Sequence, residues 1–399
     1  MLIVQKYGGT SVGTLERIEN VAARVIETKK SGADVVVVVS AMSGVTNQLV
    51  DYASHYTKDP DGVAMDMLLS SGERVTCALL TIALINLGYP AVGLSGRLAG
   101  IITDSVHTKA RIEAIDTKRM KEELKTGKIV VVAGFQGIDE KGDATTLGRG
   151  GSDLSAVAIA GALDADLCEI YTDVDGVYTT DPRIEPKAKK LDKISYDEML
   201  ELASLGAKVL QNRSVELAKK LNVNLVTRSS FNHNEGTLIT KEESMEAVLV
   251  SGIALDKNQA RVTLRGVVDK PGIAAEIFTA LAEKNINVDM IIQNVGQDGT
   301  TNLGFTVPQN ELHVAKECMD KLSASREILY NDEIVKVSVV GVGMKSHTGV
   351  ASLAFQTLAN EGINIQMIST SEIKISMIVD QKYGELAVRA LHEAYKLDK

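Results

Sequence analysis

Five consecutive valines, Val35 to Val39, constrain the fold of this chain more than any other feature. A strand that is apolar on both faces fits the middle of a parallel sheet that helices cover on both sides. Further strand-like segments occur at 91–94, 129–135, 167–171 and 223–227, and stretches with helical spacing lie between them. This alternation predicts an α/β domain with a doubly wound, mostly parallel sheet.

The opening run Leu2–Val12 indicates a strand, a glycine turn and the approach to a helix. Backbone N–H groups of such a turn can approach an anion, and Lys6 adds a positive charge at the end of the strand. A phosphate site and an ordinary turn with a surface lysine both fit this pattern. The run is neither a dinucleotide fingerprint nor a Walker loop, since no Gly-Lys-Ser/Thr follows the glycines.

Polar residues also follow the valine strand, and a second glycine-rich segment occupies 145–153. Ser40 and Thr46 stand at the carboxyl end of a strand, where ligands bind in open α/β sheets. Turn and capping chemistry explains them as well. Arg149 lies between glycines, where it can donate two parallel hydrogen bonds to a small carboxylate. The alternative is a capped loop that carries a surface arginine.

Charged side chains mark three further stretches. We expect a helix over 65–87 with Glu73 near its start, either at a site or in a solvated first turn. The stretch 108–127 alternates basic, acidic and apolar residues, which predicts an exposed helix. The long loop 172–183 follows a strand and carries several charges, and Lys208 could reach the same edge of the sheet.

The bulk composition narrows the class of protein. A net charge of -9 argues against general binding to nucleic acids or to anionic membranes. Cys77, Cys168 and Cys318 are scattered among apolar residues, so we expect reduced, buried thiols in a cytoplasmic protein. We find no Cys/His cluster for a metal, no basic leader, and no apolar run that approaches the ~20 residues of a membrane span.

An internal repeat follows a charged break near residue 241. Gly272 aligns with Gly349 at an offset of 349 − 272 = 77, and several residues after the first glycine meet identical residues in the second copy. In the first copy they are Ala274, Phe278, Leu281, Ala282, Ile286, Asn287, Met290 and Ile291. Each copy has the pattern of strand, glycine turn, helix and strand, which predicts two small βαβ-like modules.

Lys-Tyr-Gly-Gly-Thr-Ser at 6–11 resembles the opening signature of the aspartokinases, ATP-dependent enzymes that phosphorylate the side-chain carboxylate of aspartate. The segments that begin at Ser40, Glu73, Arg149, Thr172 and Lys208 follow in the family's order and approximate spacing. The resemblance implies an amino-acid-kinase catalytic domain over 1–240, with L-aspartate and MgATP as ligands. Its reaction is the first step of lysine, threonine and methionine biosynthesis.

The resemblance also implies two sets of site residues. The nucleotide set is Lys6, Tyr7, Gly8, Gly9, Thr172, Asp173, Tyr178, Arg183, Lys208 and Val209. The aspartate set is Ser40, Thr46, Glu73, Arg149, Gly150, Gly151, Ser152 and Asp153. Among these, Lys6, Arg149 and Asp153 are the expected catalytic residues, and no residue is assigned as a ligand of Mg²⁺.

Elementary chemistry suggests how these groups act. An aspartate side chain, with a pKa near ~3.9, is already ionised at pH 7, so no general base is needed. The difficulty is to bring two anions together, which calls for positioning and charge neutralisation. We expect Lys6 and Mg²⁺ to offset charge on the phosphoryl group, Arg149 to bind the α-carboxylate, and Glu73 to bind the α-ammonium.

The repeated modules resemble ACT domains, which bind small amino acids between paired copies. The resemblance implies a linker at 241–247 and a regulatory region at 248–399, in which a second unit (336–399 with strand 248–255) carries a first unit (262–335) as an insertion. The expected effector residues are Asp269, Pro271, Gly272, Ile273, Ala274, Asn287, Val288, Asp289, Gln293, Val350, Asn364 and Ile365. Lysine, threonine or both are the expected inhibitors. We expect at least a homodimer, and a separate regulatory subunit could start near Met245.

Two alternatives remain at this stage. Another amino-acid kinase of the same fold, such as a glutamate kinase, would not explain the paired ACT units. A catalytically inactive amino-acid sensor would have no need of Lys6, Glu73, Arg149 and Asp173. Because the chain ends just after the second unit, we expect a monofunctional enzyme without a fused homoserine dehydrogenase.

Overall fold

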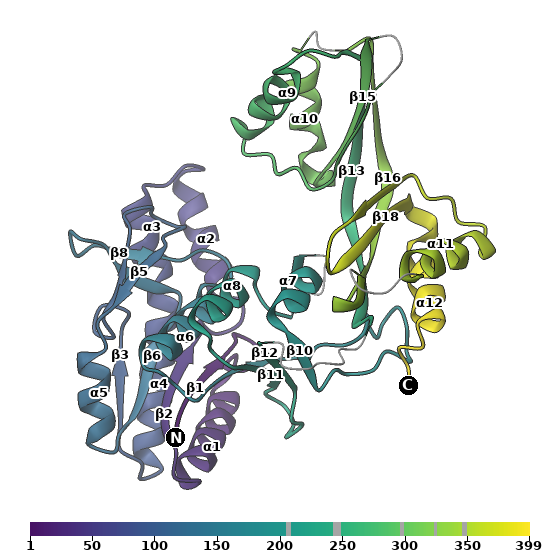
Figure 1. The fold of residues 1–399 in the computed structure, drawn as a ribbon. Helices are drawn as coiled ribbons and strands as arrows, with labels where there is room; N and C mark the ends of the chain where they lie inside the picture. Colours follow the sequence, from purple (N-terminus) through teal and green to yellow (C-terminus); the bar gives the residue numbers. More distant parts are fainter. Residues whose placement is uncertain (205–208, 242–248, 296–298, 323–324, 345–348) are drawn as a thin grey trace. The chain divides into compact units, whose positions relative to one another are not determined.

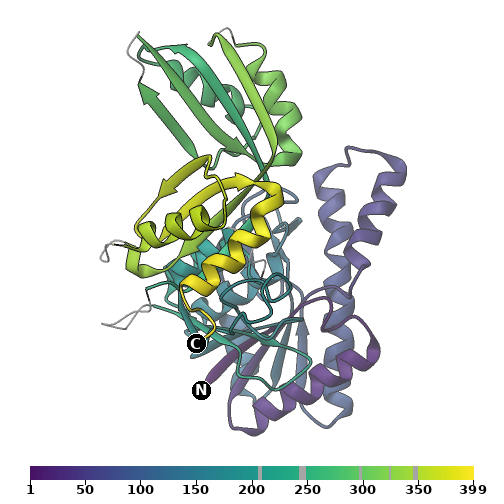
Figure 2. The ribbon, with the colours of Figure 1, turned by 90° about the vertical axis from the view of Figure 1, so that its right-hand side faces the viewer.

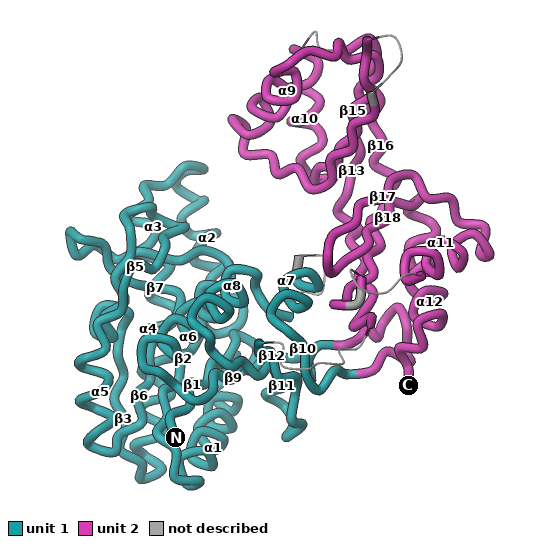
Figure 3. The backbone as a smooth tube through the Cα atoms, viewed as in Figure 1, with its two compact units in different colours: residues 1–177, 190–203, 208–244 teal, residues 178–189, 204–207, 245–399 magenta. Residues whose placement is uncertain are grey.

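The computed structural model describes residues 1–399 except 205–208, 242–248, 296–298, 323–324 and 345–348. The chain divides into two compact units (Figure 3). Unit 1 comprises 1–177, 190–203 and 208–244, and unit 2 comprises 178–189, 204–207 and 245–399. Most of the expected linker, 242–247, lies outside the described residues.

A large sheet with the order β10-β12-β11-β9-β1-β2-β6-β3 forms the centre of unit 1 (Figure 1). Its strands are β1 (Leu2–Tyr7), β2 (Asp34–Val39), β3 (Ala91–Leu94), β6 (Ile129–Ala133), β9 (Leu167–Thr172), β10 (Lys193–Ser195), β11 (Leu225–Ser229) and β12 (Thr237–Thr240). All neighbours pair in parallel except β11 and β12. The valine strand β2 is central and buried, as its composition predicts.

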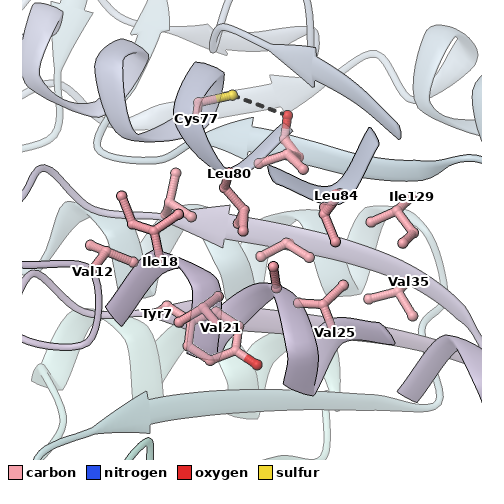
Figure 4. Close-up of a cluster of buried hydrophobic side chains, with 14 of the residues drawn as sticks. Tyr7, Val12, Ile18, Val21, Val25, Val35, Cys77, Leu80, Leu84 and Ile129 are labelled. Carbon is pink, nitrogen blue, oxygen red and sulfur yellow. Dashed lines mark hydrogen bonds between the residues drawn. The ribbon is translucent and has the colours of Figure 1, made fainter. Parts of the chain in front are cut away.

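Helices cover both faces of this sheet, which confirms the doubly wound α/β fold. On one face, α1 (Leu15–Lys30) and α4 (Ser71–Asn86) pack Ile18, Val21, Leu80 and Leu84 against the odd-numbered valines of β2 (Figure 4). The even-numbered positions face α6 (Gly151–Ala162), since a Cβ on Gly134 would lie near both Val38 and Ser152. Unit 1 also contains the helices α5 (Lys118–Lys125), α7 (Tyr196–Ser204) and α8 (Asn212–Leu221).

A smaller sheet, β5-β4-β7-β8, lies with α2 (Val45–Tyr56) and α3 (Gly62–Leu69) in unit 1. Its strands are β4 (Ile101–Thr103), β5 (Ile112–Ile115), β7 (Gln136–Ile138) and β8 (Ala144–Thr146). The helix expected over 108–127 was wrong, because Ile112–Ile115 pair with β4 and only 118–125 form a helix. That shorter helix buries Met120 and Leu124 at i, i+4 spacing. The helix expected over 65–87 is divided at Ser70 into α3 and α4.

Residues 62–86, taken as one helical stretch, are long and apolar enough by those two criteria alone to cross a membrane, which the sequence analysis did not recognise. Core helices meet the same criteria, and 44% of the qualifying window is buried inside the protein. The three cysteines are buried and free, as expected, and the Cys77 thiol donates to the Val131 carbonyl at 3.4 Å.

Unit 2 holds the repeat in one sheet of order β14-β15-β13-β16-β18-β17. The strands are β13 (Gly252–Val268), β14 (Ile291–Val295), β15 (Thr300–Val307), β16 (Glu327–Val340), β17 (Met367–Thr370) and β18 (Lys374–Asp380). The helices are α9 (Ile273–Ala282), α10 (Leu312–Met319), α11 (Val350–Asn360) and α12 (Gly384–Ala394). One half of β13 pairs with β16 in the second module (Gly252 opposite Val340), and the other half pairs with it in the first (Arg265 opposite Glu327).

Each module packs two helices on its part of this sheet. In the first module, α9 and α10 bury Ile277 and Met319 against Phe305. In the second, α11 and α12 lie side by side and bury Leu358 and Leu391 against β16 and β18 (Figure 2). The repeat extends to backbone detail, because Gly272 and Gly349 both take a left-handed conformation immediately before a helix.

The segment 178–189, which the sequence analysis placed in the kinase domain, belongs to unit 2. The Ile253 N–H donates to the Thr179 carbonyl at 2.7 Å, and the Thr179 hydroxyl lies 2.9 Å from Nε2 of the buried His392. Ile184 packs against the core of the second module, and Lys189 Nζ donates to the Lys399 carbonyl. The segment is therefore built into the second module.

Candidate active site

A cavity of about 290 Å³ opens in unit 1, near the carboxyl ends of β1, β2 and β6. It is lined by Lys6, Gly9, Ser40, Ala41, Met42, Ser43, Gly44, Thr46, Glu73, Phe135, Gly148, Arg149, Gly150, Gly151, Ser152 and Asp153. All eight residues of the expected aspartate set line this one cavity, although they come from three separate stretches of sequence. Six lining residues were not predicted, although most of them lie inside the motifs described above: Ala41–Gly44, Phe135 and Gly148.

The lysine of the opening motif points into this cavity. Lys6 is the fifth residue of β1 and is 9% exposed, and its Nζ lies 2.6 Å from Oδ1 of Asp153 at the start of α6. The pair is an ion pair by distance, but Oδ1 accepts no hydrogen bond of good geometry. Asp153 therefore holds the Lys6 ammonium next to the glycine turn by charge attraction.

Glu73 is a buried carboxylate of the cavity with one unsatisfied oxygen. Its side chain is 3% exposed, and Oε1 accepts a hydrogen bond from the Ala41 N–H at 3.2 Å. Oε2 is buried and has no hydrogen-bond partner. Burial raises the Glu73 pKa from 4.5 to about 7, because the ionised form is poorly solvated. A cation delivered by a ligand would satisfy Oε2 and favour the ionised form.

Arg149 supplies the opposite charge. It is exposed at the tip of its loop, and among the described residues its guanidinium has no hydrogen bond or ion pair. Two helices, α2 and α6, begin at the cavity after Gly44 and Gly150, each in a left-handed conformation. Helix N-termini attract anions, so the cavity combines positive groups for carboxylate or phosphate with one acidic group for an ammonium.

Two glycines here are fixed by close packing. A Cβ on Gly9 would lie 2.9 Å from the Ala41 carbonyl, so the opening turn lies directly against the loop after β2. A Cβ on Gly150 would lie 2.0 Å from Cγ of Gln211, and Gly150 has a φ of +73°. Any larger residue at these positions would displace the walls of the cavity.

Part of the expected nucleotide set lies next to the glycine turn. Thr172 is the last residue of β9, which pairs with β1, and Asp173 follows it. The Gly8 N–H donates to the Tyr171 carbonyl at 3.3 Å. The Tyr7 ring does not fit the expected role, since it is fully buried and stacks on Tyr171 with centroids 4.6 Å apart. The Tyr7 backbone is also used inside the protein, since residue 7 pairs with β2 and β9 and its carbonyl accepts a hydrogen bond from the Ser40 N–H at 3.1 Å.

The other described members of that set are not among the residues that line the cavity. Tyr178 and Arg183 lie in the segment that belongs to unit 2, where Arg183 forms an ion pair with Asp181 at 2.6 Å. Val209 is in a turn, and Lys208 lies outside the described residues. Among the described residues, no three His, Cys, Asp or Glu side chains group into a metal site.

The expected effector residues occupy corresponding places in the two modules. Asp269, Pro271, Gly272, Ile273 and Ala274 surround the start of α9, Asn287, Val288 and Asp289 precede β14, Gln293 lies on β14, and Val350, Asn364 and Ile365 flank α11. Asp289 is not free, because it forms an ion pair with the buried Lys336 of β16, which also lies 3.8 Å from Asp256. Of the corresponding turn in the second module, 345–348 lie outside the described residues.

Known proteins are similar to this chain both in its single domains and over its full length. The model of the amino acid kinase family matches residues 1–228, and the ACT domain model matches 262–321 and 337–395. The aspartokinase of Helicobacter pylori (strain J99) is 62% identical over 405 aligned residues, which cover 100% of both chains.

Two solved structures of E. coli aspartokinase III are each 26% identical to the chain. The complex with aspartate and ADP (R-state) has a TM-score of 0.82 and covers 99% of both chains. The complex with lysine and aspartate (T-state) has a TM-score of 0.78 and covers 98% of this chain and 99% of that one. With one cavity that collects the expected aspartate residues, an amino-acid-kinase domain and paired ACT domains, the chain belongs to the aspartokinase family, whose enzymes phosphorylate aspartate.

Proposed function

We propose that the cavity of unit 1 binds L-aspartate through its α-ammonium and its α-carboxylate. The side-chain carboxylate of aspartate then meets the terminal phosphoryl group of ATP, and the product is 4-phospho-L-aspartate. The observation that carries this proposal is the pairing of opposite, unsatisfied charges in one cavity. Buried Glu73 has an oxygen without a partner, and Arg149 has a guanidinium without one among the described residues. An α-amino acid supplies the complement of both.

The transfer itself needs no proton. A carboxylate oxygen of aspartate forms a bond to the γ-phosphorus, the bond from that phosphorus to the bridging oxygen breaks, and ADP leaves with the electron pair. The side chains have to position two anions and offset their charge. Lys6 serves that role on the transferred phosphoryl group, Asp153 holds Lys6 in place, and the start of α6 with Ser152 faces the reacting groups.

The nucleotide set supports the same arrangement only in part. Gly8 and Gly9 shape the turn at the end of β1, Thr172 ends the neighbouring strand β9, and Asp173 follows it. The described residues offer no grouped carboxylates for a metal, so Mg²⁺ would be held by the phosphates of ATP and by water. Mg²⁺ supplies charge neutralisation on these phosphates when it is bound.

We further propose that the ACT modules carry feedback inhibition by lysine, threonine or both, and that the chain forms a homodimer or higher oligomer in the cytoplasm. A related aspartokinase has been solved with lysine bound, which supports lysine as an effector class. The two modules differ in the sequence before the glycine that precedes their first helix, Asp-Lys-Pro in one and Ser-His-Thr in the other, which supports unequal binding. The reaction would then be the first, controlled step of lysine, threonine and methionine biosynthesis.

The test is ADP release from MgATP with aspartate, alone and with lysine, threonine or both at millimolar concentration. Aspartate-dependent turnover that one amino acid lowers would support the kinase and identify its effector. Inhibition only by the pair would indicate two cooperating ACT sites. Turnover with glutamate but none with aspartate would refute the substrate and leave the fold unaffected.

A further inference from the structure

A fully buried carboxylate that has no part in the proposed chemistry lies close to the cavity. Asp66 of α3 is 0% exposed, and each of its oxygens has a partner. Oδ1 accepts hydrogen bonds from the Thr108 N–H at 3.0 Å and from the Thr146 hydroxyl. Oδ2 lies 2.8 Å from Nδ1 of His107 and 3.1 Å from the Thr108 N–H.

These partners come from segments that lead to the aspartate residues. Thr146 is the last residue of β8, and Arg149 follows three positions later. Asp66 itself lies in α3, which leads through Ser70 directly into α4 and Glu73. The carbonyl of Thr108 is the nearest atom, at 3.3 Å, to a Cβ placed on Gly148, so the 107–108 segment also packs against the arginine loop, residues 147–150.

A buried carboxylate is an expensive way to join three segments if only stability matters. Apolar side chains of similar volume often do so at less cost, whereas directed hydrogen bonds fix geometry. The two groups that would hold the ends of aspartate, Glu73 and Arg149, lie on separate elements. The distance between Glu73 and Arg149 must match one α-amino acid. Asp66 is connected to both elements, because α3 continues through Ser70 into the helix of Glu73 and Thr146 of the strand before the arginine loop donates a hydrogen bond to Asp66.

We propose that Asp66 is a positioning residue for aspartate: it fixes the arginine loop relative to the helix that carries Glu73, through its hydrogen bond with Thr146. This inference rests on the proposed function of the cavity. Loss of that hydrogen bond lets Arg149 shift relative to Glu73 without removing either group. A shift of this kind weakens the binding of aspartate before and during the reaction alike, so it acts on KM.

The chain offers a matched control on the same strand. Thr145 and Thr146 are both 0% exposed, and they point to opposite faces of β8. The Thr145 hydroxyl bonds to the Thr103 hydroxyl at 2.6 Å, whereas the Thr146 hydroxyl bonds to Asp66. Thr145→Val and Thr146→Val therefore each remove one buried hydrogen bond, and only the second one reaches the proposed positioning residue.

The experiment compares full-length wild type, Thr146→Val, Thr145→Val and Asp66→Asn by steady-state ADP release, with thermal unfolding alongside. We expect Thr146→Val and Asp66→Asn to raise the aspartate KM about tenfold or more, with the ATP KM unchanged within about twofold. Thr145→Val should lower the unfolding temperature about as much as Thr146→Val and leave the aspartate KM unchanged. If Asp66→Asn does not fold, the two threonine variants decide.

Equal aspartate KM values in Thr145→Val and Thr146→Val would overturn the positioning role, whether both rise or neither does. A rise in the ATP KM of the same size in Thr146→Val would also overturn it, because the cavity would then be disturbed as a whole. Absence of aspartate-dependent turnover in the wild type would instead refute the proposed function, and the positioning role with it.

Discussion

Replacing Glu73 by Gln should remove a pH dependence of aspartate binding near neutrality. Burial raises the Glu73 pKa to about 7, and Oε2 has no partner. If the ionised carboxylate binds the α-ammonium of aspartate, the binding-competent fraction rises from about one tenth at pH 6 to about nine tenths at pH 8. In the wild type, kcat/KM for aspartate should therefore be about tenfold lower at pH 6 than at pH 8.

The same shift links pH to stability. The folded-state pKa of Glu73 lies above its ordinary value of 4.5, so the contribution of Glu73 is most favourable below pH 4.5 and is lost as the pH rises through about 7. The loss is about 3 kcal/mol, because 7 − 4.5 = 2.5 and each whole pKa step corresponds to ~1.4 kcal/mol. Glu73→Gln never ionises, so at pH 8 it should be more stable than the wild type while binding aspartate at least about tenfold more weakly.

The assay is initial-rate ADP release between pH 6 and pH 8, with aspartate varied at saturating MgATP, together with urea unfolding at pH 8. The pH profile of Glu73→Gln separates this carboxylate from other groups that titrate in the same range. A flat wild-type profile, or a Glu73→Gln enzyme with an unchanged aspartate KM, would refute the reasoning. A variant less stable than the wild type at pH 8 would show that Glu73 is satisfied by a partner in the folded protein.

Three further substitutions test other parts of the site. Lys6→Met should lower kcat about 100-fold or more with a smaller effect on the aspartate KM, because Lys6 acts on charge that develops during transfer; steady-state rates at saturating substrate check this. Arg149→Ala should raise the aspartate KM about tenfold to about 100-fold and leave the ATP KM nearly unchanged, as expected for a charged hydrogen bond lost from bound aspartate; an unchanged aspartate KM would contradict its role. Gly150→Ala should weaken aspartate binding because its Cβ would meet Gln211. A Gly150→Ala/Gln211→Gly double variant should recover part of the lost binding in the same KM assay. If it recovers none, the left-handed φ of Gly150, and not the contact with Gln211, accounts for the loss.

Most of the aspartate site could be predicted from the sequence. Its residues follow strand ends, and the carboxyl ends of neighbouring parallel strands meet at one edge of a sheet. Because β1 and β2 pair side by side, Lys6 and Ser40 come together without any further information. Local sequence marks Glu73 and Arg149 as candidates, but only the family resemblance placed them in one site with Ser40, since nothing around them specifies which edge they approach.

The remaining features depend on packing between distant segments, which local patterns do not encode. Nothing around Asp66 indicates that its partners lie at 107–108 and at 146. The stretch 112–115 forms a strand because β4 is available as a partner, although its charges resemble those of an exposed helix. The ring of Tyr7 is buried because position 7 alternates to the core face of β1, a property that its place in a phosphate-binding motif conceals.

Residues 178–189 have a consequence for how this chain can be divided. In the sequence, the boundary between the catalytic and regulatory halves lies near 244. Residues 178–189 precede that boundary but belong to the second module, and the chain before and after them belongs to unit 1. A fragment that ends at 244 would lack the N–H of Ile253 and the ring of His392 that satisfy Thr179, and it would expose Ile184 to water. The catalytic half is thus structurally unfinished on its own, whereas the strands and helices of the regulatory half, from 252 on, come from one continuous stretch of chain.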